Sequence, residues 1–175
     1  MSTVPIAGGE SSFRGVAVNP ITGKLYWTSS RADEGIKVRW ANLDGSSEEV
    51  IFALPAGAMN IRGIAVDPVS EKLYFVDGGV GVVVKLELDG SGVMSGPGGN
   101  IVNRDPANGL TGIAVDHING HIYWVEQCSA GGTGLGTIQR ANLDGSSVTT
   151  VVSGLGSPRW IALDPAGNTM YWTEA

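Results

Sequence analysis

The chain has 175 residues, a length typical of one domain. Hydrophobic residues make up 42%, charged residues 16%, and 27 residues are glycine. This composition argues against intrinsic disorder and suits an all-β fold with many tight turns. The net charge is −6 and there is no run of Lys or Arg. Nucleic-acid binding is therefore not expected, because neutralising phosphates needs a clustered basic surface.

The sequence predicts no signal peptide at its start, no membrane span and no internal disulfide. The first five residues lack the charged start and apolar run of a signal peptide. No apolar stretch approaches the roughly 20 residues of a membrane span, so membrane insertion is not expected. Cys128 has no partner for an internal disulfide, and the fold must rest on packing.

Three motifs recur in fixed order, the first two with a period of 48 or 49 residues. The first begins at Arg14, Arg62, Thr111 and Arg159 and reads, in outline, R-G-I-A-V-D-P. The second motif is four residues long. It consists of a tyrosine, a second aromatic residue and two further residues, and it begins at Tyr26, Tyr74, Tyr123 and Tyr171. The third ends in Leu-Asp-Gly and contains Asp44, Asp89 and Asp144.

Each period is predicted to hold four strands. Residues 3–8 resemble the end of a period and are expected to form a fourth strand. In the second period, strands are expected at 63–66, 72–77 and 83–88, with turns at 67–71 and 89–91. Fourth strands are expected at 49–52 and 149–152, and near 100–102 in the second period. No stretch of useful length has apolar residues at the spacing expected of an amphipathic helix.

Four-stranded units repeated every 40–50 residues or so are typical of a β-propeller. We expect a single propeller unit over 1–175, with repeats at about 14–61, 62–110 and 111–158. A partial repeat at 159–175 would combine with an N-terminal strand at 1–13. The blade-to-blade packing is expected to come from the paired aromatic residues of the second strands: Tyr26, Trp27, Tyr74, Phe75, Tyr123, Trp124, Tyr171 and Trp172.

These motifs resemble the YWTD propeller of the low-density lipoprotein receptor family. The resemblance implies an extracellular or cell-surface, usually six-bladed ring whose partners dock on one face around the channel. The chain departs from the pattern at Ser29, where an acid is expected, and has Glu at 126 and 174. It also has Lys85-Leu86-Glu87 in place of Arg-Ala-Asn.

The repeat count predicts self-association. Three full periods with fragments would give 15 strands, one short of four blades. An open stack would leave apolar faces and strand edges in water. We expect a homodimer that closes one ring, with a four-bladed monomer as the alternative.

Several residue types that can carry chemistry are interpreted as turn or loop residues. His117 and His121 flank a hairpin turn, and Cys128 lies in a loop without a nearby base. The aspartates of the Leu-Asp-Gly motifs recur once per period, which indicates turn caps and not a catalytic pair. No catalytic residue, metal ligand or cofactor is expected.

One face collects the remaining candidates. Strand one begins where its antiparallel neighbour, strand two, ends, so Arg14, Arg62 and Arg159 share a face with Asp77, Glu126 and Glu174. One interpretation is that these charges pair between neighbouring blades, and the other is that they bind a partner. Irregular positions favour binding. They are Trp160, Arg31, Asp33 and Glu34.

The sequence thus predicts a scaffold that binds a protein or peptide. The alternative is a metal-dependent propeller hydrolase, lactonase or lyase with its site in the central channel. A third class is a purely structural repeat with no separable ligand.

Overall fold

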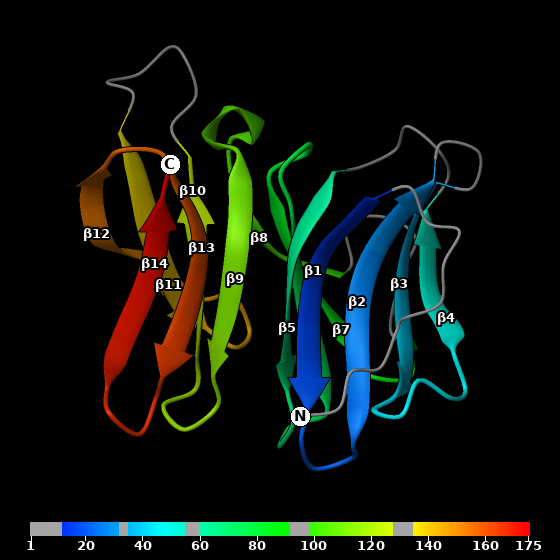
Figure 1. The fold of residues 1–175 in the computed structure, drawn as a ribbon. Helices are drawn as coiled ribbons and strands as arrows, with labels where there is room; N and C mark the ends of the chain where they lie inside the picture. The colour runs from blue at the N-terminus through cyan, green and yellow to red at the C-terminus, as the bar shows by residue number, and fades with distance from the viewer. Residues whose placement is uncertain (1–11, 32–34, 55–59, 92–98, 128–134) are drawn as a thin grey trace.

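The computed structural model describes residues 12–31, 35–54, 60–91, 99–127 and 135–175. They form fourteen strands and a short 3-10 helix, η2 (Figure 1). The strands of the first two periods are β1 (Ser12–Asn19), β2 (Lys24–Arg31), β3 (Gly35–Asn42), β4 (Glu49–Leu54), β5 (Ile61–Asp67), β6 (Lys72–Asp77), β7 (Val82–Glu87) and β8 (Asn100–Asn103). After η2 (Pro106–Asn108) come β9 (Leu110–Asp116), β10 (His121–Glu126), β11 (Gly136–Asn142), β12 (Thr149–Leu155), β13 (Pro158–Asp164) and β14 (Thr169–Glu174).

The strands form three four-stranded antiparallel sheets and one two-stranded sheet, each in chain order. The predicted all-β propeller of four-stranded blades is confirmed. The second strand of the second period lies at 72–77 as predicted, and β8 confirms the fourth strand expected near 100–102. The strand expected at 3–8 falls outside the described residues. In the described part of the chain, no helix has the length and hydropathy needed to cross a membrane.

The first strand of each blade packs against the first strand of the next. A glycine in the first motif of each of the first three periods permits this contact. A Cβ on Gly63 would lie 2.6 Å from the Thr111 carbonyl oxygen. One on Gly15 would lie 2.8 Å from the Arg62 carbonyl, and one on Gly112 would lie 2.9 Å from the Arg159 carbonyl. Real Cβ atoms do not come this close, so the glycines set the spacing of the inner strands.

A second contact between blades forms at the Leu-Asp-Gly turns. The aspartates cap these turns, as predicted: Asp44 and Asp144 each accept the backbone N–H of the serine two residues later at 2.9 Å. The glycine after each motif aspartate has a positive φ, for example +80° at Gly90, after Asp89, and +86° at Gly145, after Asp144. Each of these glycines packs closely against an outer strand of the preceding blade, Gly90 against the Ile51 carbonyl and Gly145 against the Ile101 carbonyl.

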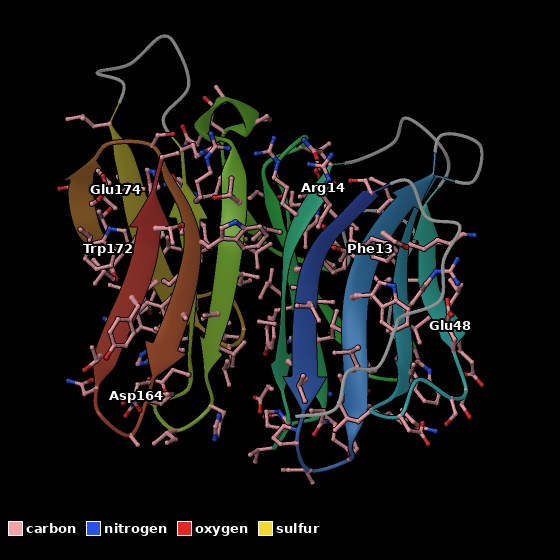
Figure 2. The ribbon with its side chains drawn as sticks, in the orientation of Figure 1. Phe13, Arg14, Glu48, Asp164, Trp172 and Glu174 are labelled. Atoms are coloured by element: carbon pink, nitrogen blue, oxygen red, sulfur yellow. The ribbon has the colours of Figure 1, made fainter. Side chains whose placement is uncertain are left out.

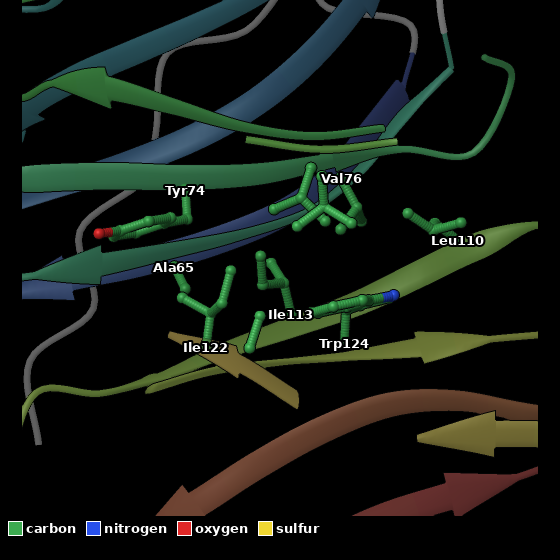
Figure 3. Close-up of a cluster of buried hydrophobic side chains, with 10 residues drawn as sticks. Ala65, Tyr74, Val76, Leu110, Ile113, Ile122 and Trp124 are labelled. Atoms are coloured by element: carbon green, nitrogen blue, oxygen red, sulfur yellow. The ribbon is translucent and has the colours of Figure 1, made fainter. Parts of the chain in front are cut away.

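Hydrophobic side chains fill the seams between sheets, in a repeating pattern. A tyrosine of one blade joins the same cluster as an isoleucine in the first strand of the next blade. Figure 3 shows the seam of Tyr74 and Ile113, with Trp124 beside them. The equivalent pairs are Tyr26 with Ile64 and Tyr123 with Ile161.

The expectation that all four aromatic pairs lie between blades is wrong for the last one. Trp27 and Trp124 are buried, at 2% and 0% exposure. Trp172 is 38% exposed and Tyr171 is 60% exposed. The reason is positional, because β13 and β14 form the outermost pair and no described sheet packs on the far side of β14.

The acid two residues after the second-strand tryptophan accepts its indole N–H. Trp124 Nε1 donates to Glu126 Oε1 at 3.0 Å, and Trp172 Nε1 donates to Glu174 Oε1 at 3.1 Å. In the first period Ser29 replaces this acid. There the Trp27 indole nitrogen is buried without a hydrogen-bond partner among the described residues. The departure at Ser29 therefore leaves a buried donor unsatisfied.

Two glycines with the same backbone geometry provide a test of the turn contact. Gly120→Ala should cost about 1 kcal/mol, because Gly120 has φ +73° but nothing within 4 Å. Gly145→Ala should cost roughly 1–3 kcal/mol more, because its methyl group would meet the Ile101 carbonyl. Urea unfolding of both variants measures the difference. Equal losses would show that this contact does not hold the blades.

A second matched pair tests the indole hydrogen bond. Trp27→Phe and Trp124→Phe remove the same atoms from buried sites, and the buried Phe75 shows that a phenyl ring suits the position. Only Trp124→Phe breaks a bond to a carboxylate. We expect it to cost about 1–2 kcal/mol more than Trp27→Phe in denaturant titrations. A larger loss for Trp27→Phe would contradict this assignment.

Candidate functional site

The predicted face exists as a continuous edge of the blades. Residues at the start of each first strand pair with residues at the end of the second. Examples are Ile61 with Asp77 and Pro158 with Glu174. Figure 2 shows Arg14 and Glu174 toward this edge and Asp164 toward the opposite one. We call the edge that carries Arg14, Arg62 and Arg159 the arginine face, and the opposite edge the turn face.

The acids of the arginine face are held by internal bonds. Asp77 is fully buried, and its Oδ1 accepts the backbone N–H groups of Asn60 at 3.0 Å and Gly79 at 2.7 Å. Glu174 Oε2 accepts the Gly156 N–H at 2.7 Å. These carboxylates hold loops and an indole ring in place, although the second oxygen of Asp77, Oδ2, is buried without a hydrogen-bond partner among the described residues.

Glu126 is the most heavily bonded of these acids. It accepts Arg104 Nε at 2.5 Å, Asn108 Nδ2 at 3.0 Å and the Trp124 indole N–H. Arg104 follows β8 and Glu126 ends β10, so this ion pair joins two neighbouring blades. Sequence reasoning missed Arg104 and Asn108. The only signal was the Asp105-Pro106 step, which starts η2 and lies outside the repeated motifs.

In the part of the chain that the structure describes, the three repeated arginines make no such pair. Arg14 and Arg159 are exposed and Arg62 is half-buried. Within the described residues, none of the three has a carboxylate within ion-pair distance. The Nε of Arg62 is buried without a hydrogen-bond partner there. Among the described residues, an ion pair between blades is made by Arg104 and by none of the repeated arginines.

The arginines are close enough to affect one another. Burial lowers the pKa of Arg62, and the positive charges of Arg14 and Arg159 lower it further, while Asp77 acts in the opposite direction. Three of the four inner strands, β1, β5 and β13, thus place like charges in one region. An anionic group there would relieve this repulsion and satisfy the buried Arg62 nitrogen.

The irregular candidates are only partly described. Trp160 is 47% exposed and takes the place that glycine holds in the other first motifs. Its backbone N–H donates to Thr173 Oγ1 at 3.3 Å. Arg31 ends β2, but its side chain falls outside the described atoms, as do residues Asp33 and Glu34.

The other chemistry-bearing residues lie where turns were predicted. Asp116 Oδ1 accepts the backbone N–H groups of Ile118 and Asn119, which closes the hairpin between His117 and His121. Cys128 falls outside the described residues. Across 12–31, 35–54, 60–91, 99–127 and 135–175, no group of three or more His, Cys, Asp or Glu is arranged to hold a metal ion.

Comparison with known proteins places the chain among propellers. No model of a known protein family matches it. It is 31% identical over 173 residues to "Low-density lipoprotein receptor-related protein 1" of Pyricularia oryzae, covering 91% of this chain and 56% of that protein. Among solved structures, it resembles a chain of a nidogen/laminin complex with a TM-score of 0.76 at 19% identity, covering 93% of this chain and 57% of that one.

Enzymes with propeller folds are also similar in structure. A gluconolactonase from Xanthomonas campestris has a TM-score of 0.66 at 19% identity, covering 93% of this chain and 54% of that one. Such low identity reports the fold alone. The chain spans just over half the length of the relatives it matches.

The repeated motifs, the four-stranded blades and the receptor-related relative agree with one another. The chain is built of YWTD-type β-propeller repeats of the low-density lipoprotein receptor family.

Proposed function

We propose that this chain is a binding module that takes up a protein or peptide on its arginine face, and that it is not an enzyme. The observation that carries this proposal is the contrast in bonding on that face. The acids are used by the fold, whereas Arg14, Arg62 and Arg159 have no ion-pair partner among the described residues. The extracellular or cell-surface location is part of the same proposal and rests on the family.

The chemistry of the face favours an acidic segment of the partner. Guanidinium groups bind carboxylates through paired, charge-assisted hydrogen bonds. Trp160 adds an exposed ring next to Arg159, and exposed tryptophan and arginine are common anchors of protein interfaces. A peptide that carries a carboxylate with an apolar neighbour fits both features.

Substitution of one arginine tests the proposal. Arg62→Gln should weaken binding of a glutamate-rich peptide about tenfold at low salt, because it removes the half-buried charge between Arg14 and Arg159. Isothermal calorimetry measures the affinity, and thermal unfolding confirms that the variant folds. Arg140→Gln, on β11 away from the face, is the control with the same change in charge.

His117→Ala, in a turn on the opposite face, should leave binding intact. A peptide that binds equally to wild type, Arg62→Gln and Arg140→Gln would show that the arginine face is not its site.

Self-association is the second part of the proposal, supported by repeat positions whose burial differs. Ile64 and Ile113 are 6% exposed, because each packs on a tyrosine of the preceding blade. The equivalent Val16 is 62% exposed. At the other side, Tyr171 is exposed where Tyr74 is buried. Val16 of one copy on Tyr171 of another would repeat the seam found inside the chain, and two such seams close a ring of two copies.

Light scattering coupled to size exclusion should give twice the 18.1 kDa mass of one chain. Tyr171→Asp should yield monomers, because it places a charge in the apolar seam. Val69→Asp, at an exposed turn position outside that seam, should stay dimeric. A monodisperse wild-type monomer at micromolar concentration would overturn this part of the proposal.

A metal-dependent lactonase or related hydrolase is the alternative function, favoured only by the structural likeness to the gluconolactonase. Elemental analysis of the purified protein separates the two. A stoichiometric, tightly held divalent metal would support the hydrolase.

A further inference from the structure

A groove lies on the turn face, between the first and second blades, away from the arginine face. It encloses about 500 Å³. The first blade contributes the beginning of β2 and the end of β3, and the second contributes the turns around Glu71 and Asp89. A hollow of this size can hold a side chain or a short peptide segment.

The lining of the groove is strongly acidic. Its four carboxylates are Glu49, Glu71, Glu87 and Asp89, against one cation, Lys24. Among the described residues, the carboxylates of Glu49 and Glu71 make no ion pair or hydrogen bond. Glu87 holds Lys72, whose Nζ lies 2.6 Å from Glu87 Oε1. At least two negative charges therefore stay uncompensated between the blades.

The groove already holds one ammonium group against an aromatic wall. Lys24 Nζ lies 3.5 Å from the centroid of the Trp40 ring, a cation–π contact. This internal contact shows that the aromatic lining and the surrounding carboxylates suit an organic cation.

Tyr26 provides an independent observation. It lines the groove and is 1% exposed, and its hydroxyl makes no hydrogen bond among the described residues. Its counterpart Tyr74 donates its hydroxyl to the Leu143 carbonyl at 3.3 Å. Burial and the nearby charge of Glu71 raise the pKa of Tyr26. A ligand N–H donor in the groove would give this hydroxyl the partner that it lacks among the described residues.

One departure from the repeat explains why the groove is acidic at this seam. Asn42 and Asn142 each donate from Nδ2 to a turn serine at 2.9 Å. Glu87 takes this position in the second blade and has no side-chain N–H to donate. Its carboxylate binds Lys72 and lines the groove. Between the second and third blades, Lys85 Nζ and the Tyr74 hydroxyl both donate hydrogen bonds to the Leu143 carbonyl oxygen.

We propose that this groove binds a basic side chain, an arginine or lysine, presented by a partner peptide. The guanidinium or ammonium group would lie between Glu49 and Glu71, with one N–H directed to the Tyr26 hydroxyl. Its alkyl stem would pack beside the Trp40 ring. The site is separate from the arginine face, so the proposal stands independently of the ligand proposed there.

The test uses two probes. One is N-acetylarginine methylamide, and the other is the peptide Gly-Gly-Arg-Gly-Arg-Gly-Gly with both termini capped so that they carry no charge. Binding is followed by calorimetry at low ionic strength and again at 0.5 M salt. Glu49→Gln and Glu71→Gln should each weaken peptide binding about three- to tenfold, as expected for a partly screened charge pair. Neither should alter the thermal unfolding temperature by much, because neither side chain has a bond to lose.

Asp144→Asn is the matched control, since it removes one carboxylate from the same face at the next blade. It should leave binding unchanged. Binding of the capped arginine alone would show that one side chain suffices, and binding of the peptide alone would show that the segment is needed. Either result supports the proposal. Failure of both probes to saturate, or an equal loss with Asp144→Asn, would overturn it, because attraction to the net charge of −6 would then explain the data.

Discussion

The close approach of successive first strands is the constraint on which the rest of the structure depends. At Gly15, Gly63 and Gly112 the backbone of one blade meets the backbone of the next without room for a Cβ. This spacing brings the sheets near enough for a tyrosine of one blade to cover an isoleucine of the next. Because arginine precedes two of these glycines, the same contact draws Arg14 and Arg62 together. The seam and the charged face therefore have one cause.

The motif acids serve the fold before they serve any ligand. Glu126 and Glu174 accept the indole N–H of the tryptophan two residues earlier. Asp77 lies two residues after Phe75, whose side chain has no N–H. Asp77 accepts backbone N–H groups of a loop instead. The same position thus satisfies whichever buried donor its own blade presents. Where no acid stands, at Ser29, the Trp27 nitrogen remains unsatisfied.

Strands, turns and the edge that collects Arg14, Arg62 and Arg159 could be predicted from the sequence, because all follow from the period. What could not be predicted depends on neighbours in space. The motifs around Trp124 and Trp172 are nearly identical, yet one ring is buried and the other is exposed. Likewise, Glu126 pairs with Arg104, from a segment outside the motifs, and not with a repeated arginine. The departure at Glu87 was visible, but its consequence needed the adjoining blade, whose Glu49 and Trp40 form the other wall.

The two edges of the blades differ in charge for a reason rooted in the repeat. First strands begin with arginine on one edge, whereas the turns on the other edge require aspartate to cap them. Turn aspartates are held by local N–H groups and are not free to bind. A binding site on that edge must therefore come from other carboxylates, such as Glu49 and Glu71, which line the groove beside the departure at Glu87. On the arginine face, Trp160 is the corresponding break, since a large ring replaces the glycine. In this scaffold the regular positions set the distance between blades, and the irregular ones set what can bind between or upon them.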